Sequence, residues 1–259
     1  MAAVPTQPPT RRAIDAMTEL LIDDHGAVRV LTMNRPDKRN ALNLSLSEAL
    51  FVTLLEADKA KGVRAIVLTG AGPAFCAGAD LSEFAALSAA NAPLVERRAD
   101  ITAKLHGVFS QLTKPVVSAI NGAAMGGGAG LALAGDIALM SATAKLGYPE
   151  VKHGIVASVV MANLLRQGGR KAAFELVATG EPIDAARALT LGLVNRVVAP
   201  EGLMGEAMQT AQKLASVAPQ AMAATKTLFY RVGELPFDQA LEAGRDMNRR
   251  MRAFNRDEP

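Results

Sequence analysis

The sequence contains one cysteine, Cys76, no tryptophan and only three histidines among its 259 residues. A single cysteine excludes an internal disulfide bond, and His25, His106 and His153 do not have the spacing of a zinc-binding motif. We therefore expect a reducing, cytoplasmic setting and no bound metal ion. The net charge is only +3, which argues against nucleic acid as a partner.

Long apolar runs are also absent. The most apolar stretch, residues 119–135, contains six glycines and Asn121, so it is too short and too interrupted to cross a bilayer. The first 18 residues contain several prolines and no apolar run, which argues against a secretory signal. We expect residues 1–18 to form a disordered arm and the protein to have no membrane association.

The most informative segment that is present is Asn121–Asp136, with the sequence NGAAMGGGAGLALAGD. Three consecutive glycines open an apolar, helix-like stretch directly after the β-branched run at residues 115–120. Glycine permits positive φ and close approach of a ligand to the main chain, and the first turn of a helix carries unpaired N–H groups. The segment predicts either a site for an anion or developing oxyanion, or a turn packed tightly against a neighbour.

Alternation of apolar strands and helical patterns predicts an α/β fold. We expect strands at residues 28–33, 65–69, 116–120 and 137–140, and helices at about 45–59, 99–112 and 128–133. From about Glu201 the pattern becomes wholly helical. The predicted organisation is therefore a core at residues 19–200 and a helical region at 201–259.

Two motifs together resemble the enoyl-CoA hydratase/isomerase family, also called the crotonase superfamily: PAFCAGADL at residues 73–81 and NGAAMGGGAGLALAGDI at 121–137. Further similar segments follow the family's order: NRPDKRNAL at 34–42, YPE at 148–150 and GEPIDAARALTLGLVNRVV at 180–198. The resemblance covers roughly residues 20–255. It implies a crotonase-like spiral of ββα turns, followed by a C-terminal helical region that packs subunits into homotrimers, commonly paired into hexamers. The implied ligand is an acyl-CoA thioester, with coenzyme A as part of the substrate rather than a separate cofactor.

The implied chemistry depends on negative charge that develops on the thioester oxygen. Two N–H donors aimed at that oxygen would lower the barrier. By motif position, the family's donors fall on the backbone N–H groups of Ala79 and Gly127. Gly126, in the same glycine run, is expected to contact the substrate.

The resemblance implies that an acid/base group moves the proton. Hydratases of the family use two glutamates, and the matching positions are Gly130 and Glu150 here. One carboxylate is kept, at the position used by the family's single-base 3-enoyl-CoA isomerases, although Glu150 can also be explained by its place at a helix start. Gly130 either leaves room for a bulky or branched acyl chain or only permits close helix packing. We expect Asp80 to cap the helix that follows it.

Three functions therefore stay open. The first is isomerisation of a 3-enoyl-CoA to the 2-enoyl-CoA with Glu150 as the shuttling base. The second is hydration of a 2-enoyl-CoA, including a branched, methylglutaconyl-like one, because residues 150–160 resemble hydratases of that type. The third is a CoA-binding or scaffold protein without efficient catalysis.

The resemblance also suggests where coenzyme A binds. It places the adenine near the backbone of Ala41 and Ala77, and the phosphates near Lys38 and Arg39, which can also be explained as a solvated loop edge. Phe229 matches an aromatic that reaches the ligand of a neighbouring subunit, but helix packing explains it equally well.

Two groups of charged residues have no counterpart in these motifs. Glu83, Glu96 and Asp100 are candidates for a second acid within residues 82–100. Five arginines between Arg245 and Arg256 predict a solvated helix face, although a phosphate-bearing ligand or a subunit contact could also use them.

Overall fold

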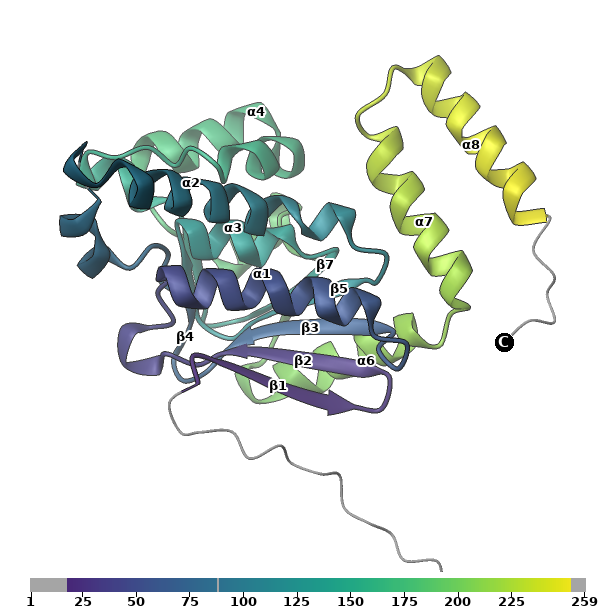
Figure 1. The fold of residues 1–259 in the computed structure, drawn as a ribbon, viewed down its shortest axis with the longest axis horizontal. Helices are drawn as coiled ribbons and strands as arrows, with labels where there is room; N and C mark the ends of the chain where they lie inside the picture. Colours follow the sequence, from purple (N-terminus) through teal and green to yellow (C-terminus); the bar gives the residue numbers. More distant parts are fainter. Residues whose placement is uncertain (1–17, 88, 253–259) are drawn as a thin grey trace, which may run out of the picture.

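The computed structural model describes residues 18–87 and 89–252 of the chain (Figure 1). The arm expected at residues 1–18 therefore falls, except for Thr18, outside the described residues, as does Arg256 of the arginine cluster. Within the described residues the strands form a six-stranded sheet and a four-stranded sheet. The mixed α/β architecture predicted from the sequence is confirmed.

The six-stranded sheet has the order β1-β2-β3-β5-β7-β10, and the four-stranded sheet has the order β4-β6-β8-β9. The strand bounds are β1 Leu20–His25, β2 Val28–Met33, β3 Ala65–Gly70, β4 Ala74–Cys76, β5 Val116–Ile120, β6 Ala123–Met125, β7 Ile137–Ser141, β8 Lys145–Gly147, β9 Ile183–Asp184 and β10 Arg196–Val198.

Successive strand pairs divide between the two sheets, and this produces the spiral of ββα turns. β3 enters the six-stranded sheet and β4 the four-stranded one, and the pairs β5/β6 and β7/β8 repeat the same division. β2, β3, β5, β7 and β10 run parallel, so the ends of β3 and β5 meet at one edge of the sheet. The two glycine-containing motifs follow these ends, which explains why segments about 50 residues apart come together.

The α-helices are α1 Leu44–Lys59, α2 Ala92–Gly107, α3 Gly127–Ala134, α4 Met161–Thr179, α5 Ala185–Thr190, α6 Leu203–Ala215, α7 Pro219–Val232 and α8 Phe237–Arg252. Short 3-10 helices are η1 Pro36–Lys38, η2 Leu81–Ala86, η3 Ala89–Asn91, η4 Phe109–Gln111, η5 Pro149–His153 and η6 Pro200–Gly202.

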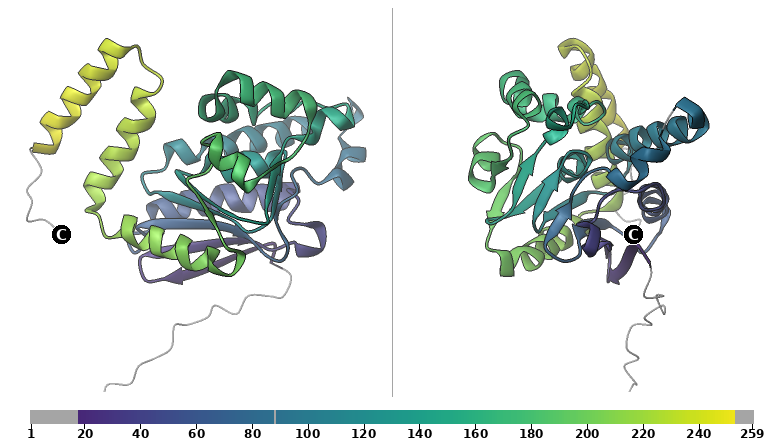
Figure 2. Two further views of the ribbon diagram at one scale, coloured as in Figure 1. Left: turned by 180° about the vertical axis from the view of Figure 1, so that it is seen from behind. Right: turned by 90° about the vertical axis from the view of Figure 1, so that its left-hand side faces the viewer.

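Helices cover both faces of the six-stranded sheet (Figures 1 and 2). α1 and α3 lie on one face, with α2 packed against these two helices, while α6 covers the other face with its buried residues Leu203, Ala207 and Ala211. α2 begins at Ala92 and ends at Gly107, earlier at both ends than the predicted 99–112. The expected start was late because the polar residues from Glu96 to Asp100 lie within the helix and hide its periodicity.

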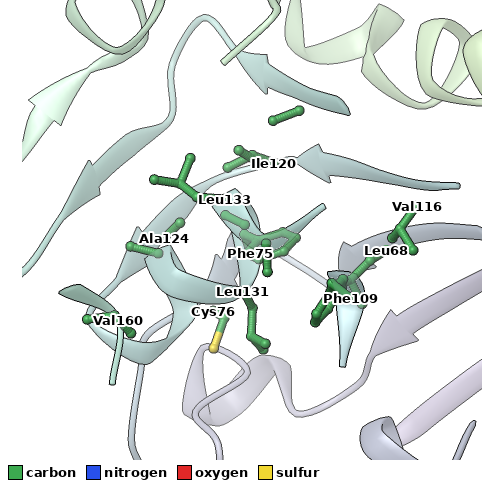
Figure 3. Close-up of a cluster of buried hydrophobic side chains, with 14 of the residues drawn as sticks. Leu68, Phe75, Cys76, Phe109, Val116, Ile120, Ala124, Leu131, Leu133 and Val160 are labelled. Carbon is green, nitrogen blue, oxygen red and sulfur yellow. The ribbon is translucent and has the colours of Figure 1, made fainter. Parts of the chain in front are cut away.

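The main core lies between the two sheets and α3 (Figure 3). Phe75 of β4 is fully buried and belongs to the same cluster as Leu131 of α3 and Phe109. All six residues of β3 are buried, as expected of a central strand covered on both faces. This packing sets the position of α3, whose first turn carries the glycine run.

α7 and α8 extend away from the sheets as a helical hairpin (Figure 1). The buried residue of α7 is Lys226, whose Nζ donates hydrogen bonds to Asp136 Oδ2 at 2.7 Å and to the carbonyl of Lys114 at 2.9 Å. Asp136 also accepts from Tyr230 Oη at 2.8 Å and from the N–H of Val116 at 2.7 Å. A buried ion pair therefore connects α7 to Asp136, in the short segment between α3 and β7.

None of the helices in residues 18–87 and 89–252 has the length and apolar character that crossing a membrane requires.

Removing the carboxylate of this ion pair is expected to destabilise the fold. Asp136→Ala leaves the Lys226 ammonium buried without its partner, so the free energy of unfolding should fall by about 3 kcal/mol, measured by urea denaturation. Tyr230→Phe removes one hydrogen bond to the carboxylate but keeps the ion pair with Lys226, so it should cost less, about 1.5 kcal/mol. Equal stability of Asp136→Ala and the wild type would show that the ion pair does not anchor α7.

Candidate active site

The glycine run forms a sharp turn into α3. Gly126 has φ +53°, a conformation that side chains rarely adopt, and it precedes the first helical residue, Gly127. A Cβ on Gly128 would lie 2.2 Å from the carbonyl oxygen of Cys76, so glycine is required for α3 to approach β4 this closely. As the first residue of α3, Gly127 has an N–H with no helical partner.

The second donor segment lies beside this turn. Leu42 donates its N–H to the carbonyl of Gly78 at 2.7 Å and accepts from the N–H of Asp80 at 2.9 Å. Peptide groups alternate in direction along an extended strand, so the N–H of Ala79 points away from Leu42. A Cβ on Gly78 would lie 3.5 Å from the nitrogen of Gly127, which shows how closely the two segments approach.

Ala79 and Gly127 both line a cavity of about 330 Å³. Its other lining residues come mainly from α2 and are Leu42, Ser47, Leu87, Val95, Arg98, Ala99, Thr102, Leu105, His106, Ser158 and Val159. The structure therefore brings together the two residues that the sequence assigned to an oxyanion hole. A cavity with two convergent backbone donors can stabilise negative charge on a bound oxygen.

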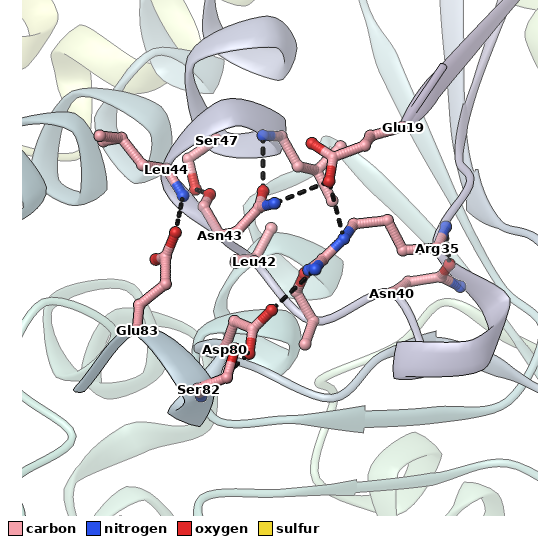
Figure 4. A network of polar contacts seen from close by, with 12 residues as sticks. Glu19, Arg35, Asn40, Leu42, Asn43, Leu44, Ser47, Asp80, Ser82 and Glu83 are labelled. Atoms are coloured by element: carbon pink, nitrogen blue, oxygen red, sulfur yellow. Dashed lines mark hydrogen bonds and ion pairs between the residues drawn. The ribbon is translucent and has the colours of Figure 1, made fainter. Parts of the chain in front are cut away.

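A polar network fixes the Ala79 segment (Figure 4). Arg35 contacts Asp80 Oδ2 at 2.8 Å and Glu19 Oε1 at 2.9 Å. Asp80 Oδ1 accepts from the N–H of Ser82 at 3.1 Å, so Asp80 caps η2 as predicted. Burial alone would raise the pKa of Asp80, but hydrogen bonds from Ser82 and Arg35 outweigh it and lower this pKa to about 2. Asp80 therefore acts as an ionised anchor beside Ala79.

Glu150 lies against the glycine turn, at the start of η5. A Cβ on Gly126 would be 2.8 Å from Glu150 Oε1, so the backbone bond lengths put Oε1 within about 7 Å of the Gly127 nitrogen. Glu150 Oε2 is buried and has no hydrogen-bond partner among the described residues, and burial raises the pKa of Glu150. A half-buried carboxylate of this kind is suited to accept a proton. Glu150 does not itself line the cavity; it lies on the flank of the turn.

The space beside Gly130 is filled by this chain's own side chains. A Cβ there would lie 2.4 Å from Val160 Cγ1 and 2.8 Å from His106 Cδ2. The expectation that Gly130 leaves room for an acyl chain is therefore wrong, and the alternative of close packing is correct. The position matched to the family's first glutamate cannot accept that side chain without displacing Val160 and His106.

His106 is a buried residue that was not predicted to belong to the site. Its Nε2 lies 3.0 Å from the carbonyl oxygen of Gly127, and its Nδ1 lies 2.9 Å from that of Thr102. Burial lowers the pKa of His106 and favours the neutral ring, which has one N–H and can donate to only one of these carbonyls. The ring packs against the first turn of α3 and thereby supports Gly127.

The residues predicted to bind coenzyme A lie together at the edge of the Ala79 segment. The N–H of Ala77 donates to the carbonyl of Arg39 at 2.9 Å, which places η1 beside β4. Lys38 and Arg39 are exposed, whereas Ala41 is buried. Phe229 is 69% exposed on α7 and is not among the cavity-lining residues, so its contact with a neighbouring subunit's ligand stays a prediction.

The three acids proposed as a second proton carrier do not line the cavity. Glu83 accepts from the N–H of Leu44, Glu96 is exposed on α2, and Asp100 pairs with Lys104 on the exposed face of the same helix. The ionisable residues in the cavity wall are instead Arg98 and His106. The sequence does contain a signal for these two residues, which is their helical spacing. Positions 95, 98, 99, 102, 105 and 106 share one face of α2, and this face lies over the cavity.

A second cavity, of about 490 Å³, lies between the end of α1 and the start of α7. Its walls include Lys59, Lys61, Arg64 and Lys114 but none of the motif residues. It is larger than the cavity at Ala79, yet it lacks the paired backbone donors. The chemistry therefore points to the smaller cavity.

The chain is similar to known proteins along most of its length. The model of the enoyl-CoA hydratase/isomerase family matches residues 23–256. A putative enoyl-CoA hydratase of Thermus thermophilus is 42% identical over 79% of this chain and 81% of the relative, and a short-chain-enoyl-CoA hydratase of Clostridium acetobutylicum is 36% identical over 87% and 86%. The crystal structure of an enoyl-CoA hydratase from Mycobacterium smegmatis has a TM-score of 0.87 and 33% identity, over 91% of each chain.

Replacement of glycine by alanine should have opposite effects on stability at Gly130 and at Gly205, although both residues lie in helices. Gly130→Ala should lower the free energy of unfolding by about 1–3 kcal/mol because Val160 and His106 must move. Gly205→Ala, at an exposed position of α6 with nothing within 4 Å of a Cβ, should raise it by roughly 0.5–1 kcal/mol. Urea denaturation measures both, and a stabilised Gly130→Ala would contradict the packing assignment.

Proposed function

The chain belongs to the enoyl-CoA hydratase/isomerase family, and we propose that it isomerises a 3-enoyl-CoA to the 2-enoyl-CoA with Glu150 as the base. The observation that carries this proposal is the single carboxylate at the glycine turn. Glu150 lies against Gly126, while the second glutamate position, Gly130, is closed by packing. One base that takes and returns a proton suffices for an isomerase.

In the proposed mechanism, the thioester oxygen accepts hydrogen bonds from the N–H groups of Ala79 and Gly127. Glu150 removes a proton from C2, and the electron pair moves into a dienolate whose charge rests on that oxygen. The protonated carboxyl then delivers the proton to C4, so the double bond shifts from C3–C4 to C2–C3. Each backbone donor contributes about 10²- to 10³-fold to such a step.

Hydration is the second candidate, favoured by the relatives that carry the name hydratase. In that reaction Glu150 would accept a proton from water as the water oxygen bonds to C3, and a proton would return to C2. Both reactions use the same donors and base. Relatives named as enzymes support either reaction over the non-catalytic scaffold that the sequence left open.

Coenzyme A is part of the substrate in both reactions, and we propose no separate cofactor. Lys38 and Arg39, together with the backbone of Ala41 and Ala77, are the proposed contacts of its nucleotide end. A cytoplasmic location stays a prediction.

The test is turnover of 3-hexenoyl-CoA and 2-hexenoyl-CoA by the wild type and by Glu150→Gln. Wild type should convert the first substrate faster than it hydrates the second. Glu150→Gln should lower turnover by about 10²- to 10⁴-fold while acyl-CoA binding persists, whereas Glu206→Gln on the exposed face of α6 should have no effect.

The pH profile supplies a second measurement on the same variants. Glu150 must be ionised to act as a base, and burial raises its pKa above the ordinary 4.5. Activity should therefore decrease as the pH is lowered, with an inflection above pH 4.5. This decrease at acid pH should be absent in Glu150→Gln. Rapid hydration without isomerisation would replace the isomerase proposal with hydration, and full activity of Glu150→Gln would remove Glu150 from either mechanism.

We also propose a homotrimer or a hexamer formed from two trimers, with α7 and α8 as the contact elements. Phe229, Phe237 and Leu241 are 69%, 75% and 59% exposed on this hairpin, which is unusual for large apolar side chains. The hairpin extends from the core (Figure 2), so another subunit can cover its apolar face.

Light scattering should give three or six times the chain mass of 27.0 kDa. The double variant Phe237→Asp/Leu241→Asp should shift the mass towards the monomer because each charge would have to be buried. Gln239→Asp adds a charge at an exposed polar position of the same helix and should leave the assembly intact. A monomeric wild type at micromolar concentration would refute the assembly.

A further inference from the structure

Arg98 places a charged group in the wall of the cavity that holds the two backbone donors. It lies on α2, and its side chain is only 11% exposed. Its neighbours along the same helix face are Val95, Ala99 and Thr102, which are apolar or neutral. A buried guanidinium in an acyl-binding cavity requires a reason, because removing a charge from water is costly.

The contacts of Arg98 use only part of its hydrogen-bonding capacity. Nη1 donates to Ser47 Oγ at 3.0 Å, and Nη2 donates to the carbonyl of Leu42. Both partners are neutral, and a guanidinium has five N–H groups. One N–H on each terminal nitrogen therefore has no partner among the described residues, and two such groups match the two oxygens of a carboxylate.

The nearby acids compensate this charge incompletely. Glu83 Oε2 lies 3.9 Å from Arg98 Nε, beyond hydrogen-bond distance, while Glu83 Oε1 accepts from the N–H of Leu44. Asp80 is bound by Arg35 and by Ser82. Burial lowers the pKa of Arg98 despite the attraction of Glu83 and Asp80, which agrees with this partial pairing.

The cavity wall as a whole favours a ligand that carries hydrogen-bond acceptors. Its described lining residues include Arg98, His106 and the backbone donors of Ala79 and Gly127, but no aspartate or glutamate. Arg98 Nη2 and the N–H of Asp80 share the carbonyl of Leu42, so these two nitrogens lie within about 6 Å of each other. The guanidinium is thus only a short acyl chain away from the N–H of Ala79.

We propose that Arg98 binds a carboxylate at the far end of the acyl chain, so that the preferred substrate is the CoA thioester of a short, unsaturated dicarboxylic acid. This inference rests on the proposed function, because it assumes that the thioester oxygen binds at Ala79 and Gly127. The thioester oxygen occupies one end of the cavity and the distal carboxylate pairs with Arg98. Arg98 then determines specificity in addition to holding the Leu42 carbonyl.

Binding of saturated analogues tests the inference without catalysis. Calorimetry should show that wild type binds glutaryl-CoA about 10- to 100-fold more tightly than pentanoyl-CoA, which has the same chain length and no carboxylate. Arg98→Gln keeps a donor for Leu42 and should abolish this preference, and Arg98→Lys should retain part of it. Arg97→Gln is the matched control, because the neighbouring Arg97 is 60% exposed and pairs with Glu48.

Turnover gives the second measurement. The ratio of kcat/KM for 3-hexenedioyl-CoA to that for 3-hexenoyl-CoA should fall at least about 10-fold in Arg98→Gln and stay unchanged in Arg97→Gln. A purely structural role for Arg98 would lower both values together and leave the ratio unchanged. Circular dichroism verifies folding, and Arg98→Lys supplies the comparison if Arg98→Gln does not fold.

The outcomes separate this inference from the proposed function. Equal wild-type affinity for glutaryl-CoA and pentanoyl-CoA, together with turnover of hexenoyl-CoA, would overturn the role of Arg98 alone. Absence of binding to any acyl-CoA would overturn the proposed function and the inference with it. A preference for glutaryl-CoA that persists in Arg98→Gln would assign the carboxylate to another residue.

Discussion

The close contact between α3 and β4 is the constraint on which the site depends. Because Gly128 has no Cβ, the helix lies directly against the carbonyl of Cys76, and the chain that continues from β4 passes beside the first turn of α3. Ala79 and Gly127, from distant parts of the sequence, then line one cavity. A side chain at Gly128 would separate the segments, so the geometry of the proposed oxyanion site depends on a packing requirement in the core.

Polar contacts hold the first turn of α3 and the segment after β4 in fixed positions. Arg35, Asp80 and Glu19 hold the Ala79 segment from outside, while His106 contacts the Gly127 carbonyl from the side of α2. Preorganised donors stabilise a developing charge without first having to reorient. In the proposed mechanism the groups that face the thioester oxygen are backbone atoms, and the ionised side chains around them hold these atoms in position.

Local patterns predicted much of the fold. The sequence predicts the strands β2, β3, β5 and β7 and the helical turn at Gly127. These elements are predictable because apolar runs, and glycines at their ends, are local properties of the sequence. The family's motifs also led to Ala79, Gly127 and Glu150. The roles of Arg98 and His106 could not be predicted in the same way, because they depend on which face of α2 lies over the cavity. The sequence left two interpretations of Gly130 open for the same reason: its neighbours Val160 and His106 are distant in sequence.

The packing of Gly130 against Val160 and His106 has an evolutionary consequence. A glutamate introduced at Gly130 alone meets both side chains, and a smaller residue at Val160 or His106 alone leaves a cavity beside the glycine. Each single step between a one-carboxylate and a two-carboxylate site therefore costs stability, whereas the combined change does not have to. We therefore expect epistasis among positions 106, 130 and 160, so that a change at one of them alters which residues the other two tolerate.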